Sequence, residues 1–136
     1  MMARKLAIDL GTVNTRIFSM GRGVVLDEPT VLAVSEDDKK VLAVGSTASD
    51  MIGKTPESIL AISPLKNGVV ADYELTEVLL RYFMDGVIGR SRLFKPDVLL
   101  SVPSGATSVE SRAVLDAAYS AGAKRANTVP AALAAS

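Results

Sequence analysis

The segment from Asp97 to Val102, DVLLSV, constrains the fold more than any other part of the sequence. It is an almost continuous apolar run, which is typical of a central parallel strand buried on both faces. A helix is predicted directly after it, because Thr107 and Glu110 have the T-x-x-E spacing of a capping box and Gly122 can end the helix. Together with the strands expected earlier in the chain, this strand–helix unit predicts an α/β domain.

The first half of the chain predicts mainly short strands. A helix is expected at 46–52, with Ser46 or Thr47 as its N-cap. A longer amphipathic helix is expected to begin after Asp72 and to end at Gly86 and Gly89. The role that we favour for Asp72 is that of N-cap, and the alternative, which rests on the family resemblance given below, is a role near a binding cleft. The segments with the strand pattern are 5–10, 15–20, 23–26, 30–34, 40–44 and 57–65.

Composition excludes several kinds of chemistry. The 136 residues contain no cysteine and no histidine, so disulfides, thiolate nucleophiles and a Ser-His-Asp triad are excluded. Fifteen basic residues balance fifteen acidic ones, which gives no indication of a nucleic-acid partner. No apolar run reaches the length of a membrane span, and the start enters a strand too soon for a signal peptide. We therefore expect a cytoplasmic protein with one domain.

The turn between the first two expected strands has an unusual chemistry. The stretch LAIDLGTVNTRIF places several backbone N–H groups, short polar side chains and the carboxylate of Asp9 within a few residues. Such a set can cradle a phosphate and hold a hydrated divalent cation. Taken alone, however, the turn is more simply a structural one, because glycine turns between strands are common.

Several longer segments together resemble bacterial actins of the MreB/Mbl family, nearly without gaps from Lys5 to Lys124. The most specific are Asp27-Glu28-Pro29, GVVADYE, and VPSG followed by VESRAV. The resemblance implies an α/β, actin-like ATPase fold that is partial: residues 1–136 would be an incomplete first lobe, with a smaller subdomain inserted at approximately 21–96. It also implies filaments at the membrane that guide cell-wall synthesis and determine cell shape.

The resemblance assigns the first turn as a phosphate loop. Backbone N–H groups would face the phosphates, Asn14 and Thr15 would add side-chain donors, and Asp9 would hold Mg²⁺ through water. Val13 stands where alanine is usual in the family, and a β-branched side chain there narrows the pocket. The implied ligands of ATP are Gly11, Thr12, Val13, Asn14 and Thr15.

The chain departs from the family after Lys124, where it reads RANTVPAALAAS. Two glutamates expected there are absent, and one of them is the family's candidate for positioning the attacking water. The second phosphate loop and the adenosine pocket are missing as well. We therefore expect weak or vestigial binding of ATP and Mg²⁺ and no competent hydrolysis.

Two functions remain open at this stage, and the first is the one that we favour. One is a cytoskeletal protein, or a truncated form of it, that associates with itself or with full-length MreB-type filaments. The other is a nucleotide-free module that caps those filaments. A third reading, part of a sugar kinase of the same superfold, fits VPSGATSVESRAV poorly.

A second site of interest is the segment SRLFKP. Leu93 and Phe94 lie between Arg90, Arg92 and Lys95, and such a loop can insert into the surface of an anionic membrane. The same pair resembles a membrane-insertion loop of the family, which would place the protein at the inner face of the cell membrane. The alternative is that both side chains cover the end of the core.

Overall fold

The computed structural model describes residues 5–54, 58–89 and 95–130. Its strands are β1 (Lys5–Leu10), β2 (Asn14–Ser19), β3 (Gly23–Pro29), β4 (Leu32–Ser35), β5 (Val41–Val44), β6 (Ile59–Ile62), β7 (Leu65–Lys66), β8 (Val69–Val70), β9 (Asp97–Val102) and β10 (Arg125–Pro130). Its helices are α1 (Ser46–Lys54), α2 (Tyr73–Ile88) and α3 (Ser108–Ser120). Within these ranges no helix is long and apolar enough to cross a membrane.

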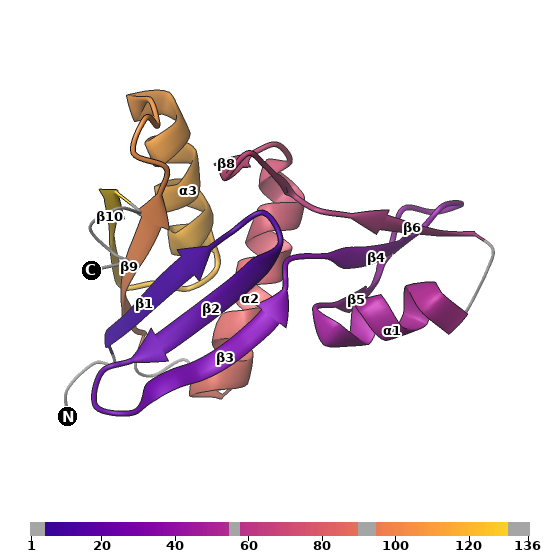
Figure 1. The fold of residues 1–136 in the computed structure, drawn as a ribbon, viewed down its shortest axis with the longest axis horizontal. Coiled ribbons are helices and arrows are strands. Elements are labelled where there is room, and N and C mark those ends of the chain that lie inside the picture. The colour runs from indigo at the N-terminus through magenta and orange to yellow at the C-terminus, as the bar shows by residue number, and fades with distance from the viewer. Residues whose placement is uncertain (1–4, 55–57, 90–94, 131–136) are drawn as a thin grey trace.

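The main structural unit is a five-stranded sheet with the order β10-β9-β1-β2-β3 (Figure 1). Strands β1, β2 and β3 form an antiparallel meander, whereas β9 pairs in parallel with both β1 and β10. The predicted strand–helix unit is therefore confirmed, with β9 inside the sheet and α3 returning the chain to the edge strand β10.

A second, smaller unit projects from the meander side of this sheet (Figure 1). It consists of the sheet β5-β4-β6 and helix α1, and it spans 32–62. Within the segment expected as an inserted subdomain, β3 instead belongs to the large sheet, and α2 packs on it. Glu28 joins the two units, because its Oε1 accepts a 2.7 Å hydrogen bond from the backbone N–H of Ser46 at the start of α1.

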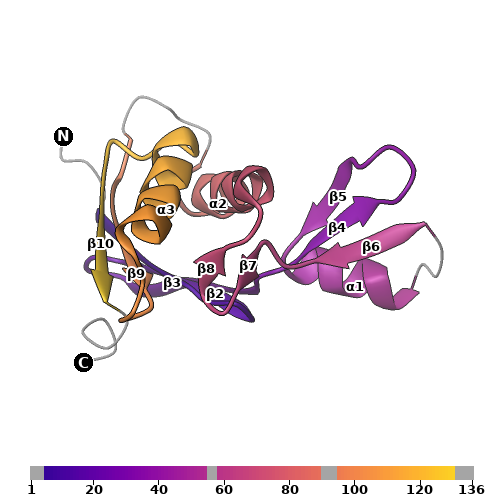
Figure 2. The ribbon, with the colours of Figure 1, turned by 90° about the horizontal axis from the view of Figure 1, so that it is seen from above.

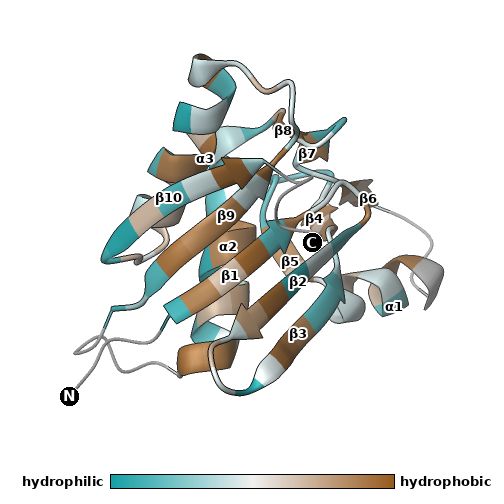
Figure 3. Cartoon of the chain, turned by 60° about the vertical axis from the view of Figure 1, so that its left-hand side comes forward, coloured by the Kyte–Doolittle hydropathy of each residue, from teal (hydrophilic) through white to brown (hydrophobic). Residues whose placement is uncertain are grey.

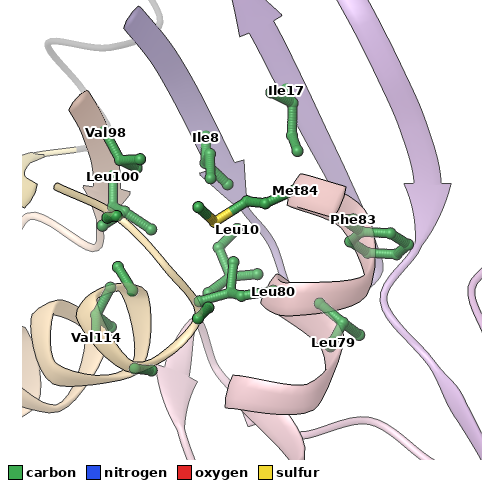
Figure 4. Packing of buried hydrophobic residues seen from close by; sticks show 14 of the residues in the cluster. Ile8, Leu10, Ile17, Leu79, Leu80, Phe83, Met84, Val98, Leu100 and Val114 are labelled. Atoms are coloured by element: carbon green, nitrogen blue, oxygen red, sulfur yellow. The ribbon is translucent and has the colours of Figure 1, made fainter. Parts of the chain in front are cut away.

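The core lies between the large sheet and helices α2 and α3, which pack side by side on one of its faces (Figure 2). Asp72 caps α2, since its Oδ1 accepts a hydrogen bond of 3.0 Å from the N–H of Leu75. Buried side chains of α2, α3 and the sheet meet there (Figure 4), among them Ile8, Leu10, Ile17, Leu79, Leu80, Phe83, Met84, Val98, Leu100 and Val114.

The prediction that Gly86 helps to end this helix was wrong. Helix α2 continues to Ile88, and the N–H of Gly89, at positive φ, bonds to the carbonyl of Asp85. Gly86 therefore lies inside the helix, where surrounding space is open. Only a glycine in the left-handed region is needed at the helix end, and Gly89 meets that need.

The opposite face of the large sheet is not covered by any described helix (Figure 3). Leu99, Ala7 and Phe18 are cross-strand neighbours on it, and Leu99 is 42% exposed and Phe18 39% exposed. We call this surface the open face; it includes a groove of about 450 Å³ at the end near Lys5 and Asp97. The expectation that the strand 97–102 is buried on both faces was therefore wrong, because only one side of it packs against helices.

Candidate functional site

The turn between β1 and β2 is closed by its own backbone. The N–H of Gly11 donates a 3.0 Å hydrogen bond to the carbonyl oxygen of Asn14. A Cβ atom at Gly11 would lie 2.7 Å from that same oxygen. Glycine is thus required by the tightness of the turn itself, in addition to any approach of a ligand.

Other segments hold the outer side of this turn. The carbonyl of Val13 accepts from the N–H of Thr30 at 2.8 Å, and the Oγ1 of Thr12 accepts from the N–H of Gly68 at 2.8 Å. Ser63 donates from its Oγ to the carbonyl of Thr12 at 3.1 Å. These contacts tie the turn to the residues that directly follow β3 and β6 and to the β7–β8 hairpin, so its conformation is set from several directions.

Two backbone donors of the turn remain available. Within the part of the chain that the structure describes, the N–H groups of Thr12 and Val13 have no hydrogen-bond acceptor. They belong to a turn in which the carbonyls of Thr12, Val13 and Asn14 are already bonded. Two neighbouring N–H donors of this kind can bind an anion with several oxygens, such as a phosphate.

The carboxylate of Asp9 lies on the open face at the end of β1. Its Oδ1 accepts a 2.9 Å hydrogen bond from the Oγ of Ser101 on β9. The cross-strand neighbour of Asp9 on β2 is Arg16, whose guanidinium pairs with Asp27 at 3.3 Å. Among the described residues, no three acidic side chains gather into a direct metal site. A lone carboxylate suits a cation that keeps most of its water, as Mg²⁺ does.

The remaining expected ligands do not all share this surface. The side chain of Thr15 is fully buried on the helix-covered face, where its Oγ1 lies 2.7 Å from the Oγ1 of Thr30. The Nδ2 of Asn14 donates a 3.4 Å hydrogen bond to Oδ1 of Asp27, and the side chain of Val13 is exposed at the tip of the turn. The structure therefore brings Asp9 and the backbone of 11–14 together and turns Thr15 away. Leu93 and Phe94 lie outside the described residues.

Sequence reasoning missed Ser101 and Gly68. Ser101 is a polar residue within the apolar run of β9, and this polar character is the signal that the sequence offered, whereas its place next to β1 is seen only in the folded sheet. Gly68 has positive φ, and a Cβ atom there would lie 2.8 Å from Cγ of Pro103. The turn 67–68 thus packs between the first loop and the start of the β9–α3 connection.

A separate charged contact lies at the other end of the sheet. Arg125 donates from Nη2 to Oδ2 of Asp97 at 2.9 Å and from Nε to Oδ1 at 3.3 Å. This hydrogen bonding from Arg125 lowers the pKa of the Asp97 carboxyl. The pair fixes the edge strand β10 to β9 and takes no part in the loop chemistry.

The arrangement defines an actin-like α/β fold with one potential phosphate loop. Among solved structures, MreB5 of Spiroplasma citri bound to ADP superposes with a TM-score of 0.81 at 32% identity, over 95% of this chain and 38% of that one. The MamK double helical filament superposes at 0.78 and 22% identity, over 93% of this chain and 41% of that one, which supports the fold alone.

Sequence comparison identifies the family. The model of the MreB/Mbl protein family matches residues 3–136, and the chain therefore belongs to this family. The cell shape-determining protein Mbl of Bacillus cereus is 48% identical over 124 residues. The cell shape-determining protein MreB of Haemophilus influenzae is 46% identical over 129 residues. Each alignment covers 91% of this chain and 37% of the relative, so the chain spans little more than a third of their length.

Proposed function

We propose that this chain is the phosphate-binding portion of a bacterial actin-like protein that takes part in cell-shape determination and in guiding cell-wall synthesis. The observation that carries the proposal is the pair of N–H groups at Thr12 and Val13, which have no acceptor among the described residues, in a braced turn that follows Asp9. The chain's family membership and the nucleotides named for MreB5 support it.

The residues fit ATP with Mg²⁺ as the ligand. The N–H groups of the turn would meet phosphate oxygens, and Asp9 would accept hydrogen bonds from water on the cation. Mg²⁺ would neutralise phosphate charge, as it does in phosphoryl transfer generally. The described part of the chain supplies one wall of such a site, so binding is expected to be weak and hydrolysis absent.

The proposed partners follow from the same membership. Self-association, or addition to full-length MreB-type filaments, is the expected assembly, and the MamK double helical filament has the same fold. A peripheral membrane contact through Leu93 and Phe94, at the inner face of the cell membrane, completes the proposal. The balanced charge of the chain favours no nucleic-acid partner.

Calorimetric titration with ATP and Mg²⁺ tests the nucleotide proposal. The expected dissociation constant is in the high micromolar range, which corresponds to a binding free energy of about −5 kcal/mol or weaker. Gly11→Ala should abolish binding, because the added Cβ displaces the carbonyl of Asn14. Gly86→Ala is the matched control and should bind as the parent does, because its Cβ enters open space. Submicromolar affinity, or equal binding by both variants, would contradict the proposal.

A further inference from the structure

The hydrogen bond between Ser101 and Asp9 joins two strands that are 92 positions apart in the sequence. Their side chains lie next to each other because β1 and β9 pair in parallel, with Ile8 opposite Leu100. An ionised carboxylate can only accept, so the hydroxyl of Ser101 is the donor. The bond engages Oδ1 of Asp9, and no hydrogen bond to Oδ2 is found within the described ranges.

Ser101 is nearly buried, at 8% exposure, whereas Asp9 is exposed. A serine hydroxyl can rotate, and here the 2.9 Å hydrogen bond to Oδ1 of Asp9 sets its donor direction. The carboxylate that it contacts loses rotational freedom about its terminal torsion, which is otherwise broad for aspartate. Oδ2 is then left for a ligand, and Asp9 lies two positions before the turn 11–14.

We propose that Ser101 is a positioning residue, which orients the Asp9 carboxylate toward a hydrated divalent cation beside the first phosphate loop. The inference rests on the proposed function for the identity of that ligand. The chemistry is that of a partner that orients a metal ligand without touching the metal, and here the ligand contacts the cation through water.

Ser101 also has a simpler explanation, namely that its hydroxyl only needs an acceptor. On that explanation Ser101→Ala changes stability and leaves cation binding unaltered. Ser19 provides the matched control, because it is a serine of the same sheet with a similar exposure of 7%. It lies on β2, opposite Leu6, at the far end of the strand from the loop.

The test is titration of the nucleotide-free chain with Mn²⁺, followed by paramagnetic broadening of the backbone amide signals of Leu10 and Gly11. The parent and Ser19→Ala should show broadening at these two residues. Ser101→Ala should need about tenfold more Mn²⁺ for the same effect, the low end for loss of a partner that orients a metal ligand. Ser101→Thr keeps the hydroxyl and should restore the behaviour of the parent.

Several outcomes overturn the inference. These are no broadening in the parent, equal broadening in the parent and Ser101→Ala, or equal losses in Ser101→Ala and Ser101→Thr. Calorimetry with ATP and Mg²⁺ is a separate measurement, which tests the proposed function independently of this inference. A parent that shows the Mn²⁺ effect and no ATP binding contradicts the proposed function alone, and ATP binding with an unchanged Mn²⁺ response in Ser101→Ala contradicts this inference alone.

Discussion

Two threonines show how neighbouring polar residues can take opposite roles in one loop. Thr12 is engaged by Gly68 at the outer side of the turn, while Thr15, three positions later, is buried against Thr30. Thr12 lies in the turn before β2, whereas Thr15 lies on β2, where the alternation of side chains turns it to the helix-covered face. The hydroxyls of Thr15 and Thr30 form a hydrogen bond with each other in the core, so they support the turn and do not contact a ligand on its surface.

A double-mutant cycle on this pair gives the first prediction. Thr15→Val alone should lower the free energy of unfolding by about 1–3 kcal/mol, because the hydroxyl of Thr30 is left buried without a partner. Thr15→Val combined with Thr30→Val should be close to the parent in stability. Urea unfolding measures both. Additive losses in the double variant would mean that the 2.7 Å contact does not couple the two residues.

The helices illustrate how far local sequence determines an element. The capping box of α3 forms as the spacing predicts, with Thr107 accepting from the N–H of Glu110 at 3.1 Å and the Glu110 carboxylate accepting from the N–H of Thr107 at 2.8 Å. Helix α1 differs, because its first N–H, that of Ser46, bonds to the side chain of Glu28 on strand β3. No local pattern could have predicted a contact between residues so far apart in the chain.

Asp72 allows the structural role and the binding role of one residue to be separated. Asp72→Ala should destabilise the protein by about 1 kcal/mol through loss of the α2 cap. Asp72→Asn keeps a capping oxygen and should retain nearly full stability. Thermal unfolding with and without ATP and Mg²⁺ measures both effects. If Asn abolishes the response to ATP while stability is unchanged, Asp72 is a ligand in addition to a cap.

The sequence predicted the main helices and strands well, and the failures have physical causes. Thr107 and Asp72 were identifiable because caps act within a few residues. Leu99 could not be placed, since an apolar strand reads the same whether one or both faces are packed. Ser101 and Thr15 depend on which strand lies alongside and on which face is covered. Both are properties of the folded sheet.

At the scale of the whole molecule, the described residues cover only one side of the large sheet. The row of Leu99, Ala7 and Phe18 lies on the open face. Charged residues lie on both sides of this row, Lys5 and Asp97 at the start of their strands and Asp9 near the end of β1. Contiguous exposed apolar surface of this kind favours association. The stability and the solubility of the chain therefore depend on different faces of the same strands.

Adjacent leucines of β9 test this separation. Leu99→Gln should reduce light scattering and binding of a hydrophobic dye, with a change in melting temperature that is small, because the side chain is already exposed. Leu100→Gln should unfold or strongly destabilise the chain, because this neighbour is fully buried. Circular dichroism during heating measures both variants. Similar stability losses at the two positions would show that the open face is packed in solution.

The parallel pairing of β1 with β9 has a consequence for the order in which the chain folds. The meander β1–β2–β3 joins neighbours in the sequence, whereas Lys5 meets Asp97 only after a loop of about 90 residues has closed. Contacts of such long range slow folding. We therefore expect the edge of β1 that pairs with β9 to stay unpaired after the meander and the small unit have formed. This unpaired edge is where a kinetic trap or a mispaired chain would begin.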